Sequence, residues 1–209
     1  MRASFTRSRL EAFSDGVLAI IITVMVLEMK VPVGGAGFEA LEPVFPMFLS
    51  YVLSFVYIGI YWNNHHHMLH ATHHVTGGIL WANLHLLFWL SLVPFVTAWM
   101  GTNHFAAAPA ALYGFVLFMS GFAYWILQSC IRRVHGNESV IARAVGEDWK
   151  GKLSLVLYLV ALPLAYVSSW IAEGLYVLVA LMWLVPDRRI ERAMAEADEA
   201  GTGQTLGRG

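Results

Sequence analysis

Six stretches of this chain are apolar over most or all of the length that a bilayer-spanning helix requires. A spanning helix needs about 20 mostly apolar residues. The six stretches run from Leu10 to Met29, Val44 to Tyr61, Ile79 to Met100, Ala107 to Ile131, Leu153 to Trp170 and Leu175 to Val185. The sixth is short and follows the fifth almost without a loop. Together they predict an all-α membrane protein with six transmembrane helices.

The composition agrees with a bilayer as the solvent. Hydrophobic residues make up 58% of the 209 residues and charged residues only 13%, whereas soluble domains are usually roughly 45–50% apolar and about 25% charged. The formal net charge of -1 provides no basic excess for nucleic acid. Cys130 is the only cysteine, which excludes an intrachain disulfide and a protein-only thiolate metal cage.

Lysine and arginine residues are concentrated in alternate connections, which predicts the orientation, because short basic loops stay cytoplasmic. They precede the first span, separate the fourth from the fifth and follow the sixth: Arg2, Arg7, Arg9; Arg132, Arg133, Arg143, Lys150, Lys152; Arg188, Arg189, Arg192. Lys30 is the single exception on the other side.

We therefore expect both termini in the cytoplasm and a multi-pass protein of the cell (plasma or inner) membrane. The first apolar run is too long for a signal peptide and no usual cleavage site follows it. Residues 1–190 would form the six-helix transmembrane domain. Residues 191–209 are small, polar and glycine-rich, so we expect a mobile cytoplasmic tail.

In the first span, Asp15 stands at the start of the apolar run. A carboxylate that faced lipid there would cost several kcal/mol, so it is expected to face protein and to have a partner. Ser14 and Asp15 also resemble the capping residues of a helix start. The chemistry of these residues leaves both interpretations open.

At about 100° per residue, the first span has two distinct faces. One face holds an apolar stripe with a hydroxyl at its edge: Gly16, Ile20, Val24 and Leu27, with Thr23 beside them. Asp15 lies on roughly the opposite side, and we expect Val17 and Ile21 to face lipid. Such a stripe is by itself typical of ordinary helix packing.

The start of this span carries a recognisable motif. Arg9, Phe13, Ser14 and Asp15 form the pattern Arg-x-x-x-Phe-Ser-Asp, which resembles the signature of the transmembrane protein 175 (TMEM175) family, the endolysosomal potassium channel and its bacterial relatives. A second element, Trp62-Asn63-Asn64-His65-His66, is similar to the family's tryptophan-and-histidine element. With the length and the helix number, the resemblance covers the chain to about residue 190.

This resemblance implies a potassium-permeable cation channel, a homotetramer of six-helix subunits whose first helices line a central pore. The family lacks a glycine-rich carbonyl filter, and this chain has no Thr-Val-Gly-Tyr-Gly string. The family's narrowest point falls five positions after the motif aspartate, at Ile20. Further apolar rings are expected at Val24 and Leu27, and Thr23 is the candidate for selectivity. A ring of apolar side chains closes a pore by expelling water, and without carbonyl ligands we expect weak selectivity.

The motif residues are expected to be structural. Trp62 and His66 are four positions apart, hence on one helical face. They would donate to Asp15 and hold the first span against the second. Arg9 would balance the acid at the cytoplasmic end, although its helical angle places it nearer the stripe.

Histidines after the second span suggest an alternative function. They crowd one connection: His65, His66, His67, His70, His73 and His74. Histidines four apart chelate zinc or copper, which would suit a metal-ion transporter or a metal- or haem-binding membrane protein. No Asp, Glu or Cys accompanies them, so we expect a solvated loop, no bound metal and no cofactor apart from permeant potassium and other monovalent cations. No nucleophile–base pair, phosphate loop or HExxH motif predicts an enzyme.

Overall fold

The computed structural model describes residues 6–32, 35, 37–70, 72, 74–135 and 149–184, and their regular elements are all helices. The tail 191–209 lies outside the described residues. In chain order the elements are α1 (Arg7–Leu27), the 3₁₀ helix η1 (Phe38–Val44), α2 (Phe45–His70), α3 (Gly77–Ser91), α4 (Val93–Thr102), α5 (Ala107–His135), α7 (Trp149–Val167) and α8 (Ser169–Leu184).

Five of the predicted spans are long and apolar enough to cross a membrane. They are α1, η1 with α2, α3 with α4, α5 and α7, and the sixth is the shorter apolar helix α8, of 16 residues. Large hydrophobic side chains stay exposed on the outside of the bundle, among them Trp81, Phe95 and Tyr166. Such surfaces are costly in water and favourable in hydrocarbon. The all-α membrane fold is therefore confirmed.

The third span is two helices instead of one. α3 ends at Ser91, Leu92 forms the junction, and Pro94 stands in the first turn of α4. Proline has no N–H to donate, and its ring clashes with the carbonyl four residues back, so the helix breaks before it. The two pieces together still run from Gly77 to Thr102.

α2 extends to His70 and does not end near Tyr61 as predicted. Most of the histidine-rich segment is therefore helical and is not a loop. Residues 62–70 include no proline or glycine, and Met68 and Leu69 are buried in the bundle. Packing of these two side chains explains why the helix continues through a polar sequence.

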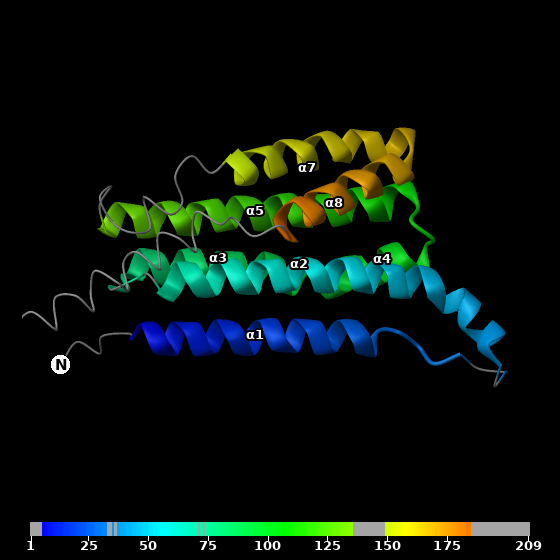
Figure 1. Cartoon of the computed structure of the whole chain (residues 1–209), viewed down its shortest axis with the longest axis horizontal. Coiled ribbons are helices and arrows are strands. Elements are labelled where there is room, and N and C mark those ends of the chain that lie inside the picture. The colour runs from blue at the N-terminus through cyan, green and yellow to red at the C-terminus, as the bar shows by residue number, and fades with distance from the viewer. Residues whose placement is uncertain are drawn as a thin grey trace, which may run out of the picture.

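The helices run back and forth along one long axis, with α1 at one edge of the bundle and α7 at the opposite edge (Figure 1). α1 packs against α2, α3 and α4, and α5 packs against α3, α7 and α8. The start of α1, the end of α2 and the end of α5 lie at the same end of the bundle (Figure 1). Every described lysine or arginine except Lys30 belongs to a helix turn at that end.

Two glycines allow helices to approach closely. A Cβ at Gly101 would lie 2.7 Å from the Cα of Met47, so α4 meets the backbone of α2 there. A Cβ at Gly114 would overlap the hydroxyl of Tyr176, which donates to the carbonyl oxygen of Ala110 at 3.1 Å. The absence of a side chain at both positions is therefore a packing requirement.

Candidate pore-lining helix and its anchoring network

α1 is covered on one face only. Its buried residues recur three or four positions apart: Leu10, Ser14, Leu18, Ile21 and Met25. The predicted stripe lies on the uncovered side, where Ile20 is 62% exposed, Val24 36% and Leu27 79%. Thr23 is also exposed, and its hydroxyl donates to the carbonyl oxygen of Ile20 at 2.9 Å. An exposed apolar face thus runs along the edge helix of the bundle.

Two residues of α1 lie elsewhere than expected. Ile21 is only 4% exposed, so it does not face lipid, and Val17 is partly buried against the same core. Apolar side chains that face lipid and those that face a helix have the same chemistry, so the sequence could not separate them. The contacts with α2, α3 and α4 decide the matter.

Asp15 has the predicted partner on α2. The indole Nε1 of Trp62 donates to Asp15 Oδ1 at 3.1 Å, and Asp15 is half-buried. This contact spans 47 positions of sequence, so it joins α1 to α2 directly. The carboxylate therefore faces protein on the side of α1 away from the apolar stripe.

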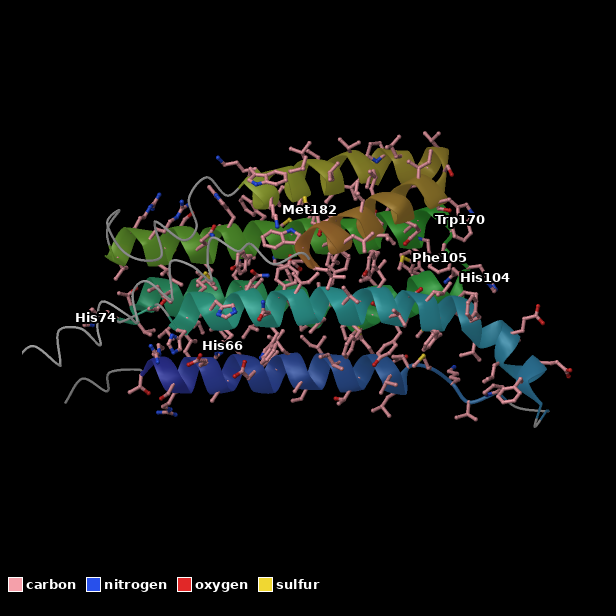
Figure 2. All side chains as sticks on the ribbon, in the orientation of Figure 1. His66, His74, His104, Phe105, Trp170 and Met182 are labelled. Atoms are coloured by element: carbon pink, nitrogen blue, oxygen red, sulfur yellow. The ribbon has the colours of Figure 1, made fainter. Side chains whose placement is uncertain are left out.

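His66 binds a different acid from the one expected. Its Nδ1 lies 3.2 Å from Glu11 Oε1, one helical turn before Asp15, and its ring stacks on that of Trp62. Figure 2 shows His66 on α2, directed toward α1. Arg7 completes this end, because its Nη1 donates to the His70 carbonyl oxygen at 2.7 Å. The end of α2 is therefore attached to the first turns of α1 by several polar contacts.

A buried chain of polar groups links α1, α2 and α3 beneath this surface. His65 Nε2 lies 2.6 Å from Asn83 Oδ1, Asn83 Nδ2 donates to Ser14 Oγ at 3.0 Å, and Ser14 Oγ donates to the Leu10 carbonyl oxygen at 2.9 Å. An amide oxygen only accepts, so His65 Nε2 is the donor. All three side chains are almost fully buried.

Sequence reasoning identified Ser14 but missed its partner Asn83, the bond from His65 to Asn83, and Glu11 as the partner of His66. Asn83 carried a signal, because an amide inside an apolar span requires a hydrogen-bond partner. Arg9 and Phe13, the other motif residues, lie on the exposed side of α1. The motif therefore divides: Ser14 and Asp15 face the bundle, and Arg9 and Phe13 do not.

The histidines do not gather around a single point in the part of the chain that the structure describes. His65 and His66 are engaged by Asn83 and Glu11. Within residues 6–32, 35, 37–70, 72, 74–135 and 149–184, no three His, Cys, Asp or Glu side chains are placed to hold one metal ion. His73 lies outside the described residues.

Comparisons with known proteins agree with this architecture. The family model described as endosomal/lysosomal potassium channel TMEM175 matches residues 9–94. A potassium channel from Chryseobacterium sp. (strain P1-3) is 53% identical over 191 residues, which cover 91% of this chain and 99% of that protein. The endosomal/lysosomal proton channel TMEM175 of Gallus gallus is 43% identical over 72 residues, 29% of this chain and 14% of that protein.

A solved structure matches the fold as well. It is described as the crystal structure of a lysosomal potassium-selective channel TMEM175 homolog from Chamaesiphon minutus. The TM-score is 0.71 at 26% sequence identity, and the match covers 86% of this chain and 96% of that one.

Fold and comparisons together define a multi-pass membrane protein of the ion-channel class, with no enzymatic role. The chain belongs to the TMEM175 family. The resemblance seen in the motif Arg9 to Asp15 is thereby confirmed, and the family assignment implies no resident cofactor.

Proposed function

We propose that this chain forms a potassium-permeable, weakly selective cation channel in which four copies place their α1 helices around a central pore. The relatives described as potassium channels support the permeant ion. The tetramer and the place of the gate are what the family resemblance implies, and the geometry of α1 supports them.

The observation that carries the proposal is the division of α1 into two faces. One face is attached to α2 and α3 by Trp62–Asp15, His66–Glu11 and the buried chain through Asn83. The other face is apolar and exposed along an edge of the bundle. A single bundle with such a helix at its edge encloses no path, whereas a ring of four copies does.

The exposed stripe supplies a hydrophobic gate. In a four-fold ring, Ile20 would form the narrowest constriction, with Val24 and Leu27 as further rings. A bare ion does not pass such a ring, because no polar group replaces its water. Thr23 would sit at the edge of the pore, and as the only hydroxyl there it is the selectivity candidate. The absence of a carbonyl filter is the reason to expect a modest preference for potassium.

The network of Ser14, Asp15, Trp62 and His66 is structural in this proposal. It lies on the side of α1 away from the stripe, so it sets the position of the pore helix and does not bind the ion. Arg9 and Phe13 are exposed beside this network, and their side chains would line the cytoplasmic entrance of the pore. The lysine and arginine residues gathered at one end of the bundle support cytoplasmic termini in a plasma or inner membrane.

Ion flux through purified protein in liposomes tests the proposal. Vesicles loaded with potassium or sodium are diluted into ion-free buffer, and a voltage dye reports the efflux. A proton-sensitive dye provides a third arm, because vertebrate relatives are described as proton channels. We expect potassium efflux, with weaker sodium efflux. Equal behaviour of protein-containing and empty vesicles would refute a channel, and complete exclusion of sodium would refute weak selectivity.

A further inference from the structure

A buried acid in α8 has no part in the proposed pore. Glu173 is the only acidic or basic residue of that helix, and its side chain is 7% exposed. Its Oε1 atom is buried and has no hydrogen-bond partner in the part of the chain that the structure describes. It lies one helical turn after Trp170, at the end of the bundle opposite the basic one (Figure 2). An ionisable side chain inside a membrane helix usually has a partner or a function.

The nearest hydroxyl groups do not donate to Glu173. Tyr113 of α5 and Tyr176, one turn further along α8, lie within electrostatic range of its carboxyl group. The Tyr176 hydroxyl donates to the Ala110 carbonyl oxygen at 3.1 Å, and the Tyr113 hydroxyl is bonded to Ser54 Oγ at 3.0 Å. Both hydroxyls are therefore engaged with other groups. A carboxylate at position 173 would lack the donors that a buried anion requires.

No positive charge compensates for the acid among the described residues. α8 packs against α2, α5 and α7. In the half of the bundle away from the basic end, the described titratable side chains of these three helices are tyrosines: Tyr51, Tyr57, Tyr113, Tyr158 and Tyr166. His104, in the turn before α5, is exposed, and its neighbour Phe105 contacts the Trp170 ring with centroids 5.5 Å apart. A buried anion without a cation is costly, whereas the neutral carboxylic acid costs much less.

The next turn of α8 is joined to the helix that holds α1. The Tyr57 hydroxyl of α2 donates to the Tyr176 carbonyl oxygen at 2.6 Å. Trp62, the partner of Asp15, lies further along the same helix. A negative charge at Glu173 would draw water toward this contact between α2 and α8 and weaken it, because water is then the only source of hydrogen bonds for the anion.

We propose that Glu173 is a proton-binding site. Its carboxyl group carries a proton when α8 packs against α2 and α5 as observed, and this proton exchanges with the solution at the end of the bundle opposite the basic one. Loss of the proton leaves a bare carboxylate among the helices and loosens α8. The packing of α8 on α2 therefore depends on the pH of that solution. This inference goes beyond the proposed function and does not depend on which ion permeates.

Infrared spectroscopy detects the proton directly, because a carboxylic acid absorbs above the amide I band and a carboxylate absorbs below it. Full-length protein is measured in liposomes. We expect a carboxylic acid band at about pH 7, where exposed glutamates, with an ordinary pKa of about 4.3, are ionised. Glu173→Gln should abolish this band. Glu39→Gln, at an exposed acid of η1, is the matched control and should retain it.

Thermal unfolding measures the effect of the proton on packing. Glutamine keeps the shape of the protonated acid and has no charge to lose. The folded chain holds this proton and the unfolded chain releases it, so the wild type should lose stability as the pH rises. Between about pH 6 and about pH 9, its melting temperature should fall by about 3 °C or more relative to that of Glu173→Gln. Glu39→Gln should behave like the wild type.

Glu173→Met gives a second uncharged side chain of similar size should Glu173→Gln not fold, and the wild-type band itself requires no variant. A wild type without a carboxylic acid band at about pH 7 would overturn the proposal. A band that both Glu173 variants retain would also overturn it, because the proton would then belong to another acid. The same pH dependence of the melting temperature in the wild type and in both variants would refute the link to packing.

Discussion

Ile20 is the residue on which the proposed gate depends. Its side chain is 62% exposed in the single subunit, five positions after Asp15. Ile20→Asn would place polar groups in the constriction, hold water there and raise the leak of both potassium and sodium by about tenfold. The leak is measured as cation efflux from liposomes at matched protein density. Val24→Asn should act in the same direction but less strongly.

Two variants control for this experiment. Ile20→Val keeps the ring apolar and should conduct like wild type. Val26→Asn adds the same amide to another exposed side of α1, where Val26 is 42% exposed, and should leave the leak low. If tetrameric Ile20→Asn conducts no better than wild type, then Ile20 is not the gate. Ile21 and Val17 are unsuitable as controls, because Ile21 is buried in the core and Val17 is partly buried against it.

Asp15 is expected to affect assembly more than permeation. Asp15→Asn weakens the acceptor for Trp62 Nε1, so we expect a loss of about 1 kcal/mol, seen as a lower melting temperature and less assembled protein. Trp62→Phe removes the donor of the same bond, so the double variant should lose little more than either single variant. Glu28→Gln, at an exposed acid beyond α1, is the matched control. Normal assembly with sharply altered ion selectivity would place Asp15 in the pore instead.

The adjacent histidines of α2 should differ in their effect on stability. His65 is 2% exposed and donates to Asn83, whereas His66 is only partly buried beside Glu11. His65→Ala leaves a buried amide oxygen without its donor and should cost roughly 2–4 kcal/mol, more than His66→Ala. His70→Ala should be neutral, because Arg7 uses only the His70 carbonyl oxygen. Thermal unfolding in detergent measures the loss of stability in each of the three variants. Equal losses would contradict the buried chain of polar groups.

At the scale of the helices, apolar length predicted the spans well because hydrophobic thickness sets helix length directly. The sequence did not locate the features that depend on contacts between helices. The end of α2 at His70 depends on burial of Met68 and Leu69 in the core. The motif predicted that His66 contacts Asp15. The register of α1 against α2 instead places His66 beside Glu11.

The helix–helix approach at Gly114 gives a prediction at this scale. Gly114→Ala puts a Cβ into the Tyr176 hydroxyl, so the Tyr176 side chain must shift or α5 and α8 must move apart, and we expect the bond to Ala110 to be lost. We expect a loss of about 1–3 kcal/mol in unfolding free energy. Tyr176→Phe in the same chain should recover part of it by removing the hydroxyl. Gly174→Ala, with open space around it, should be neutral or slightly stabilising. Equal stability of the two alanine variants would mean that the contact is looser than observed.

At the scale of the whole molecule, the bundle is asymmetric: α1 at one edge has an uncovered apolar face, and α7 forms the other edge (Figure 1). If four α1 helices surround a pore, the same residue of neighbouring subunits lies close at every ring. Native mass measurement in mild detergent should therefore give four subunits.

Cysteine crosslinking then identifies which edge faces the axis. Cys130 is the only cysteine, so a Cys130→Ser background is free of thiols. Val24→Cys or Leu27→Cys in that background should oxidise readily to covalent dimers, because each thiol forms one disulfide and four-fold symmetry brings its copies together. Val160→Cys on α7, 46% exposed at the opposite edge, should stay monomeric under the same oxidation. Dimers from α7 but not from α1 would reverse the arrangement, and a stable monomer that still conducts would remove the need for a central pore.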